Sequence, residues 1–417
     1  MTNTQPFVPI IFGGNRGGYS LARALHEQYG VTSDLVLAQI VGPVAHSKIL
    51  DYHVHPAIRT DFKTVLKQVI GEITAEYQGQ DVPKIVFGSD DEFVDDLIAY
   101  RDVFPEDWIV PYVPQSVLKK AVDKSQFYQM CEKVGVPYPK TWHLKDPILP
   151  SDVTVPLVIK PAITPSYQPL HFAGKHKVYF CDSLDEASRA LNLMRDNGYP
   201  DDFVMQEFIP GVDTDQAVVT CYRSPHDREI KMMVFGRIIL EDHGPESIGN
   251  HLVILSEDCS HSVFQHVKQL MEAFNFTGFA NFDLIWDDRI NDYLFFELNP
   301  RLGVSNYYVT MTGHNVAYYY IEDYLYRQAV KSDLKTEKKL FSLVPKKLLQ
   351  FELRDNPYLK DVKMCYREGQ VVHPLYYPAD MNWHRQSYIM LSKINFYRKF
   401  YRNYQELKKQ SKGIDDK

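Results

Sequence analysis

Apolar runs alternate with amphipathic stretches along the first part of the chain. The run Phe7 to Phe12 is followed by a glycine-rich loop, Gly13 to Gly18, and by a predicted helix from Tyr19 to Tyr29. A later apolar run, Lys84 to Phe87, again precedes a predicted helix. Strands that alternate with helices are typical of an α/β domain. Residues 1–122 are therefore predicted to form an amino-terminal α/β domain.

Three features of this domain invite a chemical interpretation. The glycine-rich loop could bind an anion at a helix start, but its spacing departs from the Gly-x-Gly-x-x-Gly pattern of dinucleotide sites. The acidic segment Ser89 to Glu92 fits a capping box, with Ser89 as the cap and acids in the first helical turn. His53 and His55 have no third ligand at a metal-site spacing, so we expect surface or substrate-adjacent histidines.

A different pattern occurs in the second half of the chain. Two strand-like runs, Phe279 to Trp286 and Tyr293 to Leu298, flank a polar turn and predict a β-hairpin. The turn sets Asp283 opposite Glu297. Asn299 shares the face of Glu297, because side chains alternate along a strand.

Two carboxylates that face each other across a strand pair destabilise it unless a cation lies between them. Carboxylate and amide oxygens are hard ligands that suit Mg²⁺, which completes its shell with water and substrate phosphates. Solvated acids on an exposed strand are the alternative, but the aromatic and aliphatic neighbours fit that alternative poorly. Asp283, Glu297 and Asn299 are therefore predicted to hold Mg²⁺ against nucleotide phosphates.

Composition narrows the function classes further. With 417 residues the chain can form two or three domains, and its net charge of −7 gives no support to nucleic-acid binding. The five cysteines include no Cys-x-x-Cys pair and do not suggest a disulfide framework. No signal peptide is recognised, and no stretch approaches the roughly 18 to 20 apolar residues that span a bilayer. We therefore expect a cytoplasmic protein.

The hairpin and the Asn299-Pro300-Arg301 segment that ends it resemble the metal-binding end of the ATP-grasp superfamily. Members of this superfamily join a carboxylic acid to an amine through an acyl phosphate. The resemblance implies an α/β and α+β multidomain protein, with an ATP-grasp fold after a Rossmann-like amino-terminal domain. It places the two-lobed ATP-grasp domain at residues 123–330 and a smaller carboxy-terminal region at 331–417. ATP and Mg²⁺ are the implied cofactors.

The resemblance also assigns cations to the nucleotide phosphates. Lys124 and Lys160 match the two phosphate-binding lysines of the superfamily, and an ammonium group suits a polyphosphate because it neutralises charge without demanding a fixed geometry. Either lysine alone would more often be a surface charge, but their order relative to the hairpin favours the phosphate role. The loop from Ala162 to Val178 resembles the loop that folds over the triphosphate, with contacts from Lys175 or Lys177.

A hinge between the two lobes is expected near residues 206–211, where an apolar run changes into a Pro-Gly turn followed by acids. The resemblance implies adenine contacts from the backbone of three residues: Glu207, Phe208 and Ile209. It also implies an acid that binds the ribose hydroxyls. Asp213 and Asp215 are both candidates, and Asp215 is the first choice.

Within the superfamily, the chain most resembles the peptidoglycan D-aspartate ligases over most of its length. Three segments carry this resemblance: Phe87 to Asp91, Ile239 to Asn250, and Glu297 to Tyr308. The implied donor is D-aspartate, activated at its β-carboxylate, and the implied acceptor is the lysine side-chain amine of a peptidoglycan precursor. Arg301 would steady the acyl phosphate, and Arg237 is a further candidate for a substrate or phosphate contact.

Other functions remain as alternatives. The same chemistry could serve another amino acid or a small peptide. A non-catalytic ATP-binding regulator is a second alternative, although the complete set of metal and phosphate residues argues against it. A dinucleotide-dependent oxidoreductase rests only on the amino-terminal glycine loop.

The end of the chain, Arg385 to Lys412, interleaves aromatic and basic residues. Such a segment could lie on an anionic membrane surface as a peripheral contact. An amphipathic terminal helix that packs its aromatic side chains on the body of the protein is the favoured interpretation.

Overall fold

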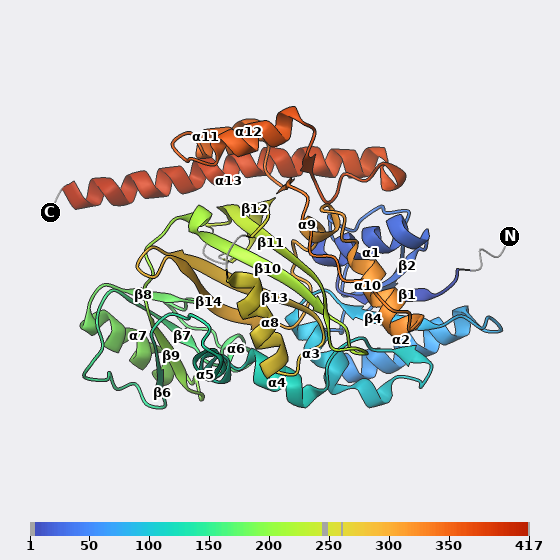
Figure 1. Cartoon of the computed structure of the whole chain (residues 1–417), viewed down its shortest axis with the longest axis horizontal. Helices are drawn as coiled ribbons and strands as arrows, with labels where there is room; N and C mark the ends of the chain where they lie inside the picture. The colour runs from blue at the N-terminus through green and yellow to red at the C-terminus, as the bar shows by residue number, and fades with distance from the viewer. Residues whose placement is uncertain (1–4, 244–248, 260–261, 416–417) are drawn as a thin grey trace.

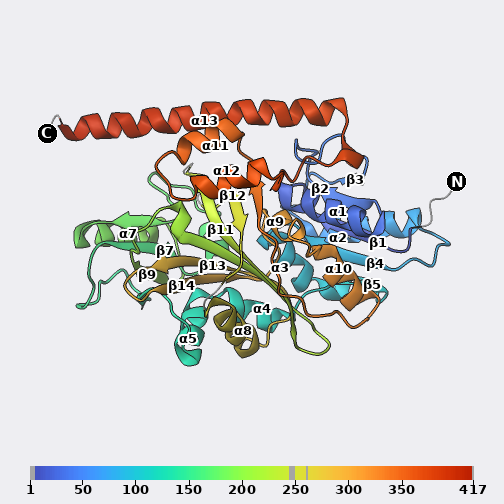
Figure 2. The same cartoon turned by 45° about the horizontal axis from the view of Figure 1, so that its top comes forward.

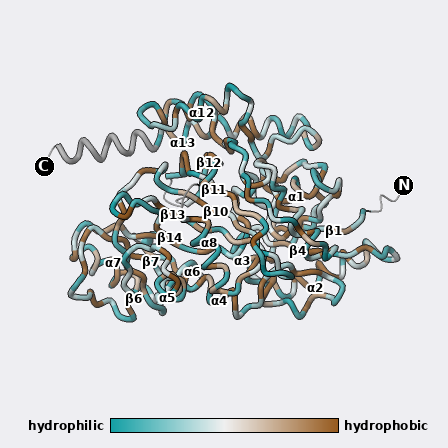
Figure 3. The backbone as a smooth tube through the Cα atoms, in the orientation of Figure 1, coloured by the Kyte–Doolittle hydropathy of each residue, from teal (hydrophilic) through white to brown (hydrophobic). Residues whose placement is uncertain are grey.

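The computed structural model describes residues 5–243, 249–259 and 262–415. Its strands form three sheets, of five, four and seven strands (Figure 1). Hydrophobic positions concentrate in the central strands of these sheets and in the helix faces that cover them (Figure 3). This arrangement confirms the predicted mixed α/β architecture.

The amino-terminal sheet is entirely parallel and has the strand order β3-β2-β1-β4-β5. Its strands are β1 Val8–Phe12, β2 Ser33–Leu37, β3 Leu50–Val54, β4 Lys84–Gly88 and β5 Trp108–Ile109. Its main helices are α1 Arg16–Tyr29, α2 Phe62–Glu76 and α3 Asp91–Ala99. Helix α1 packs on one face of the sheet and α2 on the other. Strands β1 and β2 are buried at every position, as expected for a parallel sheet covered on both faces.

The four-stranded sheet is antiparallel, in the order β6-β9-β7-β8. Its strands are β6 Thr141–Leu144, β7 Leu157–Pro161, β8 Tyr179–Cys181 and β9 Phe203–Glu207, and α7 Leu184–Asp196 covers one face. Helix α5, Lys124–Val134, precedes this sheet. Asp123 caps α5 by accepting hydrogen bonds from the amides of Ser125 and Gln126, so Lys124 is its first residue.

The seven-stranded sheet is the largest, in the order β14-β13-β10-β11-β12-β15-β16. Its strands are β10 Gln216–Arg223, β11 Ile230–Glu241, β12 His251–Ser256, β13 Gly278–Asp287, β14 Asp292–Asn299, β15 Lys339–Ser342 and β16 Val371–Val372. Helices α4 Gln115–Val122, α5 and α8 Val263–Ala273 pack on one face. The other face joins the core that includes α1, α9 Tyr307–Thr310 and α10 Val316–Tyr320.

The predicted boundary at residue 330 is not a boundary of the fold. Strand β15 pairs with β12, and β16 pairs with β15, so residues beyond 330 complete the large sheet. Helices α11 Lys346–Glu352 and α12 Leu359–Arg367 pack beside these strands. The carboxy-terminal region predicted at 331–417 therefore contributes two strands to the large sheet, because strands so short lack a core of their own.

The chain ends in one long helix, α13 Trp383–Asp415, which runs along one edge of the molecule beside α11 (Figure 2). Phe396 and Phe400 pack against the core, whereas Tyr397 and Tyr401 are exposed. The terminal helix therefore packs two of these four aromatic side chains against the protein, as the favoured interpretation expected, and exposes the other two. The side chains beyond Arg402 lie outside the description, and the membrane contact stays a prediction. Among the described residues, no helix is long and apolar enough to cross a bilayer.

Candidate nucleotide and metal site

The predicted hairpin forms from β13 and β14 with the predicted register. Asp283 is the cross-strand partner of Glu297, and Asn281 is the partner of Asn299. The register shifts immediately after Asp283, so a bulge interrupts the pairing beside these acids. Partners in an antiparallel pair point to the same face. The two carboxylates and Asn299 therefore lie together, as the sequence predicted.

The electrostatics of this pair favour a cation. Burial raises the pKa of Asp283, and the neighbouring charge of Glu297 raises it further. Burial also acts to raise the pKa of Glu297, but the positive charges of Lys124, Lys160 and Lys177 outweigh it and lower this pKa below its ordinary value. The pair thus tends to keep a proton between its carboxyl groups.

A divalent cation could replace that proton. The Asn299 side chain donates a hydrogen bond to Asp283 Oδ2 at 3.0 Å, which brings its amide oxygen, Asp283 and Glu297 into one small volume. Two carboxylates and an amide are a donor set that suits Mg²⁺, with remaining positions for water and phosphate oxygens. The residues present therefore fit the predicted ion.

Lysines from three different segments act on Glu297. Lys160 lies on β7, donates to Gln206 Oε1 at 3.3 Å and stands 5.2 Å from the centre of the Phe296 ring. Burial lowers its pKa to about 8, and the positive charge of Lys124 acts in the same direction. Lys124 comes from the start of α5. This gathering of positive charge opposite two carboxylates suits a magnesium-bound polyphosphate.

The loop between β7 and β8 supplies the third lysine. Lys177 interacts electrostatically with both Lys160 and Glu297. Lys175 is directed elsewhere, since its Nζ donates to the backbone carbonyls of Gln168 and Leu170, at 2.8 and 2.7 Å. The sequence offered both lysines as phosphate contacts, and the structure brings Lys177 to the cluster.

Arg301 is held by a residue that sequence reasoning did not assign to the site. Its Nε and one terminal nitrogen donate to the two oxygens of Asp91, at 2.6 and 2.5 Å. The Arg301 side chain is 13% exposed, and Asp91 comes from the first turn of α3. The amino-terminal domain therefore fixes the orientation of the arginine.

The helix cap in this acidic segment differs from the prediction. Asp90 caps α3 by accepting from the amide of Phe93, while Ser89 precedes the cap. The capping box of Ser89 with Glu92 was wrong, because an aspartate one residue later caps equally well. The run of acids was the sequence feature that pointed to Asp91. Helix capping accounts for Asp90 but not for the pairing of Asp91 with Arg301.

The amino-terminal glycine loop lies directly against the segment that follows Arg301. Asn306 donates from its side chain to the carbonyl of Gly17 at 3.1 Å. A Cβ atom on Gly17 would come within 3.0 Å of the Cα of Val304, so a larger residue would push the two segments apart. The amino-terminal domain thus forms one wall beside the hairpin site.

Comparison with known proteins shows what this arrangement is similar to. No protein-family model matches the chain. The chain is 27% identical over 412 residues to a D-aspartate ligase of Enterococcus faecium (strain Aus0004), which covers 95% of this chain and 97% of the relative. A solved N5-carboxyaminoimidazole synthetase from Staphylococcus aureus shares the fold with a TM-score of 0.59 and 12% identity, over 85% of this chain and 87% of that one. The chain thus has the ATP-grasp fold and resembles a carbon–nitrogen ligase over nearly its whole length.

A second solved structure has the same ATP-grasp fold. The L-amino acid ligase from Bacillus licheniformis matches with a TM-score of 0.54 and 14% identity, over 78% of this chain and 75% of that one. At such low identity the likeness concerns the fold alone. The roles of individual residues in this ATP-grasp chain therefore depend on its own geometry.

The ATP-grasp hinge lies between β9 and β10. The amide of Glu207 donates to the carbonyl of Lys140 at 3.0 Å, and that of Phe208 to Pro156 at 3.1 Å. These two N–H groups are already used in backbone pairing. The predicted adenine contacts would therefore fall to the carbonyl oxygens of these residues and to the N–H of Ile209.

The acids after the hinge have distinct partners. Asp213 accepts from the amide of Glu241 at 2.8 Å and lies 2.8 Å from His243 Nε2. Asp215 accepts from the amide of Val212 and ends a short 3₁₀ turn, whereas a place in the strand was expected. It also lines a pocket that includes Arg237. Asp215 thus borders the pocket that contains Arg237, and the ribose contact of Asp215, with Asp213 as the alternative, stays a prediction.

Arg237 points away from the metal site. Ala217 is the cross-strand partner of Arg237, whereas the next residue, Val218, is the partner of Asp283. Consecutive residues of a strand point to opposite faces, so Arg237 and Asp283 lie on opposite faces of the sheet. Arg237 instead donates to Glu257 at 2.7 Å. Arg237 therefore does not share the face of the metal site, and its contact with substrate or phosphate stays a prediction.

The last predicted segment, Ile239 to Asn250, is described in part. Gly244, Pro245 and Ile248 lie outside the described residues. Glu241 accepts hydrogen bonds from the side chain of Gln216, at 2.9 Å, and from the amide of Gly249. The carboxylate of Glu241 therefore joins the described ends of this segment to the start of β10.

Proposed function

We propose that this ATP-grasp ligase phosphorylates the β-carboxylate of D-aspartate with ATP and transfers the activated acyl group to the lysine side-chain amine of a peptidoglycan precursor. The acyl phosphate loses phosphate as the amine nitrogen attacks its carbonyl carbon, so the products are an amide, ADP and phosphate. The observation that carries the ligase chemistry is the opposed Asp283 and Glu297 pair facing three lysines. The choice of D-aspartate rests on the similarity to the Enterococcus faecium ligase over nearly the whole chain.

Each group of the site has a defined task in this proposal. Asp283, Glu297 and Asn299 would hold Mg²⁺, which supplies charge neutralisation on the phosphates. Lys124, Lys160 and Lys177 neutralise the remaining phosphate charge. Phosphoryl transfer asks for few acids or bases, since positioning and electrostatic stabilisation supply most of the rate.

Arg301 is the group that we assign to the acyl phosphate. Its fork-shaped guanidinium can bind two oxygens at once, and the bidentate pair with Asp91 fixes its plane. Asp91 therefore acts as a positioning residue. Because Asp91 belongs to the amino-terminal domain, the donor amino acid would lie between that domain and the hairpin.

The identity of the amino-acid donor is tested with hydroxylamine, which takes the place of the acceptor amine. Hydroxylamine captures an acyl phosphate as a hydroxamate, so the enzyme is incubated with Mg²⁺, ATP and hydroxylamine across a panel of D- and L-amino acids. We expect hydroxamate and ADP with D-aspartate and no product in the presence of excess chelator. The regiochemistry of the hydroxamate, read by mass spectrometry against synthetic α and β standards, reports which carboxylate was activated.

Other outcomes decide between the alternatives. Hydroxamate with a different acid would keep the ligase chemistry and reject D-aspartate as the donor. ATP binding without hydroxamate for any acid would favour the non-catalytic regulator. Binding of a nicotinamide dinucleotide is the remaining test, since the oxidoreductase alternative requires it.

The proposed substrates also set the location. An enzyme that consumes ATP and builds a peptidoglycan precursor would work in the cytoplasm, and we propose that location. A peripheral membrane contact through the terminal helix is a separate prediction. Binding of the purified protein to vesicles with anionic lipids would test it.

A further inference from the structure

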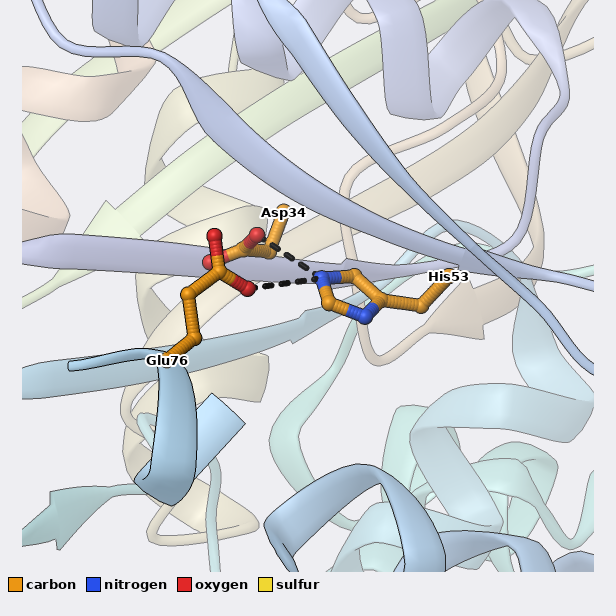
Figure 4. Close-up of side chains that lie close together, drawn as sticks. All are labelled: Asp34, His53 and Glu76. Carbon is orange, nitrogen blue, oxygen red and sulfur yellow. Dashed lines mark hydrogen bonds and ion pairs between the residues drawn. The ribbon is translucent and has the colours of Figure 1, made fainter. Parts of the chain in front are cut away.

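A second group of potential metal ligands lies in the amino-terminal domain. Asp34 on β2, His53 on β3 and Glu76 at the end of α2 each place one ligand atom within 4.8 Å of the others (Figure 4). The sequence offered no third ligand beside His53 and His55. The folded sheet supplies two, because parallel strands and the following helix bring together residues that are far apart in the chain.

The register of the two strands explains how the group assembles. Asp34 is the partner of Asp51, and Val36 is the partner of His53, so these polar side chains share the sheet face covered by α2. His53 Nε2 lies 2.9 Å from Asp34 Oδ1 and 3.9 Å from Glu76 Oε2. Figure 4 shows both carboxylates directed at this nitrogen.

The local charge is strongly negative. Four carboxylates gather around two histidines: Asp34, Asp51, Glu72 and Glu76 around His53 and His55. Within the described part of the chain, no lysine or arginine forms an ion pair with any of the four acids. Asp34 is only 1% exposed, and acids on adjacent strands that share a face repel each other. A bound cation would remove this repulsion.

The groups around the three ligands match those of known metal centres. Metal-binding histidines commonly direct their second ring nitrogen at a carboxylate. Here Glu72 Oε2 lies 3.6 Å from His53 Nδ1. Metal-binding carboxylates are themselves hydrogen-bonded, and the hydroxyl of Tyr77 donates to Asp34 Oδ2 at 3.3 Å. Both supports are thus present around the candidate ligands.

We propose that Asp34, His53 and Glu76 form a site for a divalent transition-metal ion such as Zn²⁺, separate from the magnesium site of the hairpin. Ligand atoms bound to Zn²⁺ at about 2.0 to 2.2 Å lie roughly 3.0 to 3.5 Å apart, so a small movement of the exposed Glu76 completes the contact. One imidazole and two carboxylates favour Zn²⁺ over Mg²⁺. The ion would fasten the edge strand β3 to β2 and to α2.

Metal binding is tested in a protein whose hairpin site is disabled. The double variant Asp283→Asn with Glu297→Gln is stripped with chelator, dialysed and titrated with Zn²⁺ by calorimetry, and with Co²⁺ by visible absorption. We expect one equivalent of Zn²⁺, a higher melting temperature in its presence, and a cobalt spectrum that Zn²⁺ abolishes. Binding of Mg²⁺ in place of Zn²⁺ with equal strength would overturn the proposed ion class.

Substitutions locate the ion. In the same background, His53→Gln and Glu76→Gln should each weaken Zn²⁺ binding at least about tenfold, and the exposed Glu76 should tolerate its change without loss of fold. His55→Gln is the matched control, because it removes a neighbouring imidazole outside the proposed ligand set, and it should retain the affinity. Absence of Zn²⁺ binding, or unchanged affinity in both ligand variants, would overturn the site and leave His53 as a protonated partner of the two acids.

Discussion

At the scale of single residues, the opposed acids of the hairpin decide the chemistry. Replacing Glu297 with Gln removes one carboxylate ligand but preserves its shape. We expect turnover to fall about a thousandfold or more, as when a transition-state contact is lost, while circular dichroism remains unchanged. Asp288→Asn, in the turn of the same hairpin, is the control and should keep its activity. Full activity of the Glu297 variant would contradict the assignment of Glu297 as a ligand of Mg²⁺.

The lowered pKa of Lys160 predicts how activity depends on pH. Burial lowers the pKa of this lysine to about 8, so above that pH the amine becomes neutral and cannot offset phosphate charge. The value of kcat/KM for ATP should therefore fall as the pH rises through about 8, since this ratio reports ionisations of the free enzyme. Arginine stays charged, so the residual activity of Lys160→Arg should lack this fall. The same midpoint in both proteins would assign it to another group.

At the scale of elements, the sequence predicted the structure best where an element depends on a local pattern of residues. The hairpin consists of two strand-like runs on either side of a polar turn, and this local pattern predicts the opposition of Asp283 and Glu297. The direction of Arg237 depends on register with β10, a non-local pairing that a single sequence does not reveal. The pair between Asp91 and Arg301 likewise joins elements 210 residues apart. The local pattern of the sequence was enough to predict the strands. Which side chains come into contact depends on the tertiary fold.

The contact of α3 with the end of the hairpin leads to a second kinetic prediction. Asp91→Asn removes the charge that orients Arg301, and a displaced catalytic contact can cost about a hundredfold in rate. We expect a large loss of kcat with a smaller change in KM for ATP, because the lysines that hold the phosphates are unaffected. Glu92→Gln, in the same helical turn but paired with Arg59, should behave like the original enzyme. Equal loss in both variants would indicate a general defect of α3.

At the scale of the whole molecule, the carboxy-terminal segment contacts both the amino-terminal domain and the large sheet. Asp380 is fully buried and accepts hydrogen bonds from the hydroxyls of Tyr19 and Ser47, at 2.7 and 2.8 Å. Asp380 also forms an ion pair with Arg385, at the start of α13, at a distance of 3.3 Å. Because β15 and β16 also complete the large sheet, this segment connects that sheet to the amino-terminal domain.

This connection predicts a large effect on stability. Asp380→Ala leaves Arg385 as a buried charge without its partner, and breaking a buried pair costs about 3 to 5 kcal/mol. The urea midpoint, followed by circular dichroism, should fall accordingly. Arg354→Ala breaks the exposed pair with Asp355 and should cost less than about 1 kcal/mol. If residues 331–417 were an independent region, Asp380→Ala would leave the main transition in place, whereas a connected molecule should lose stability in the amino-terminal domain and the large sheet together.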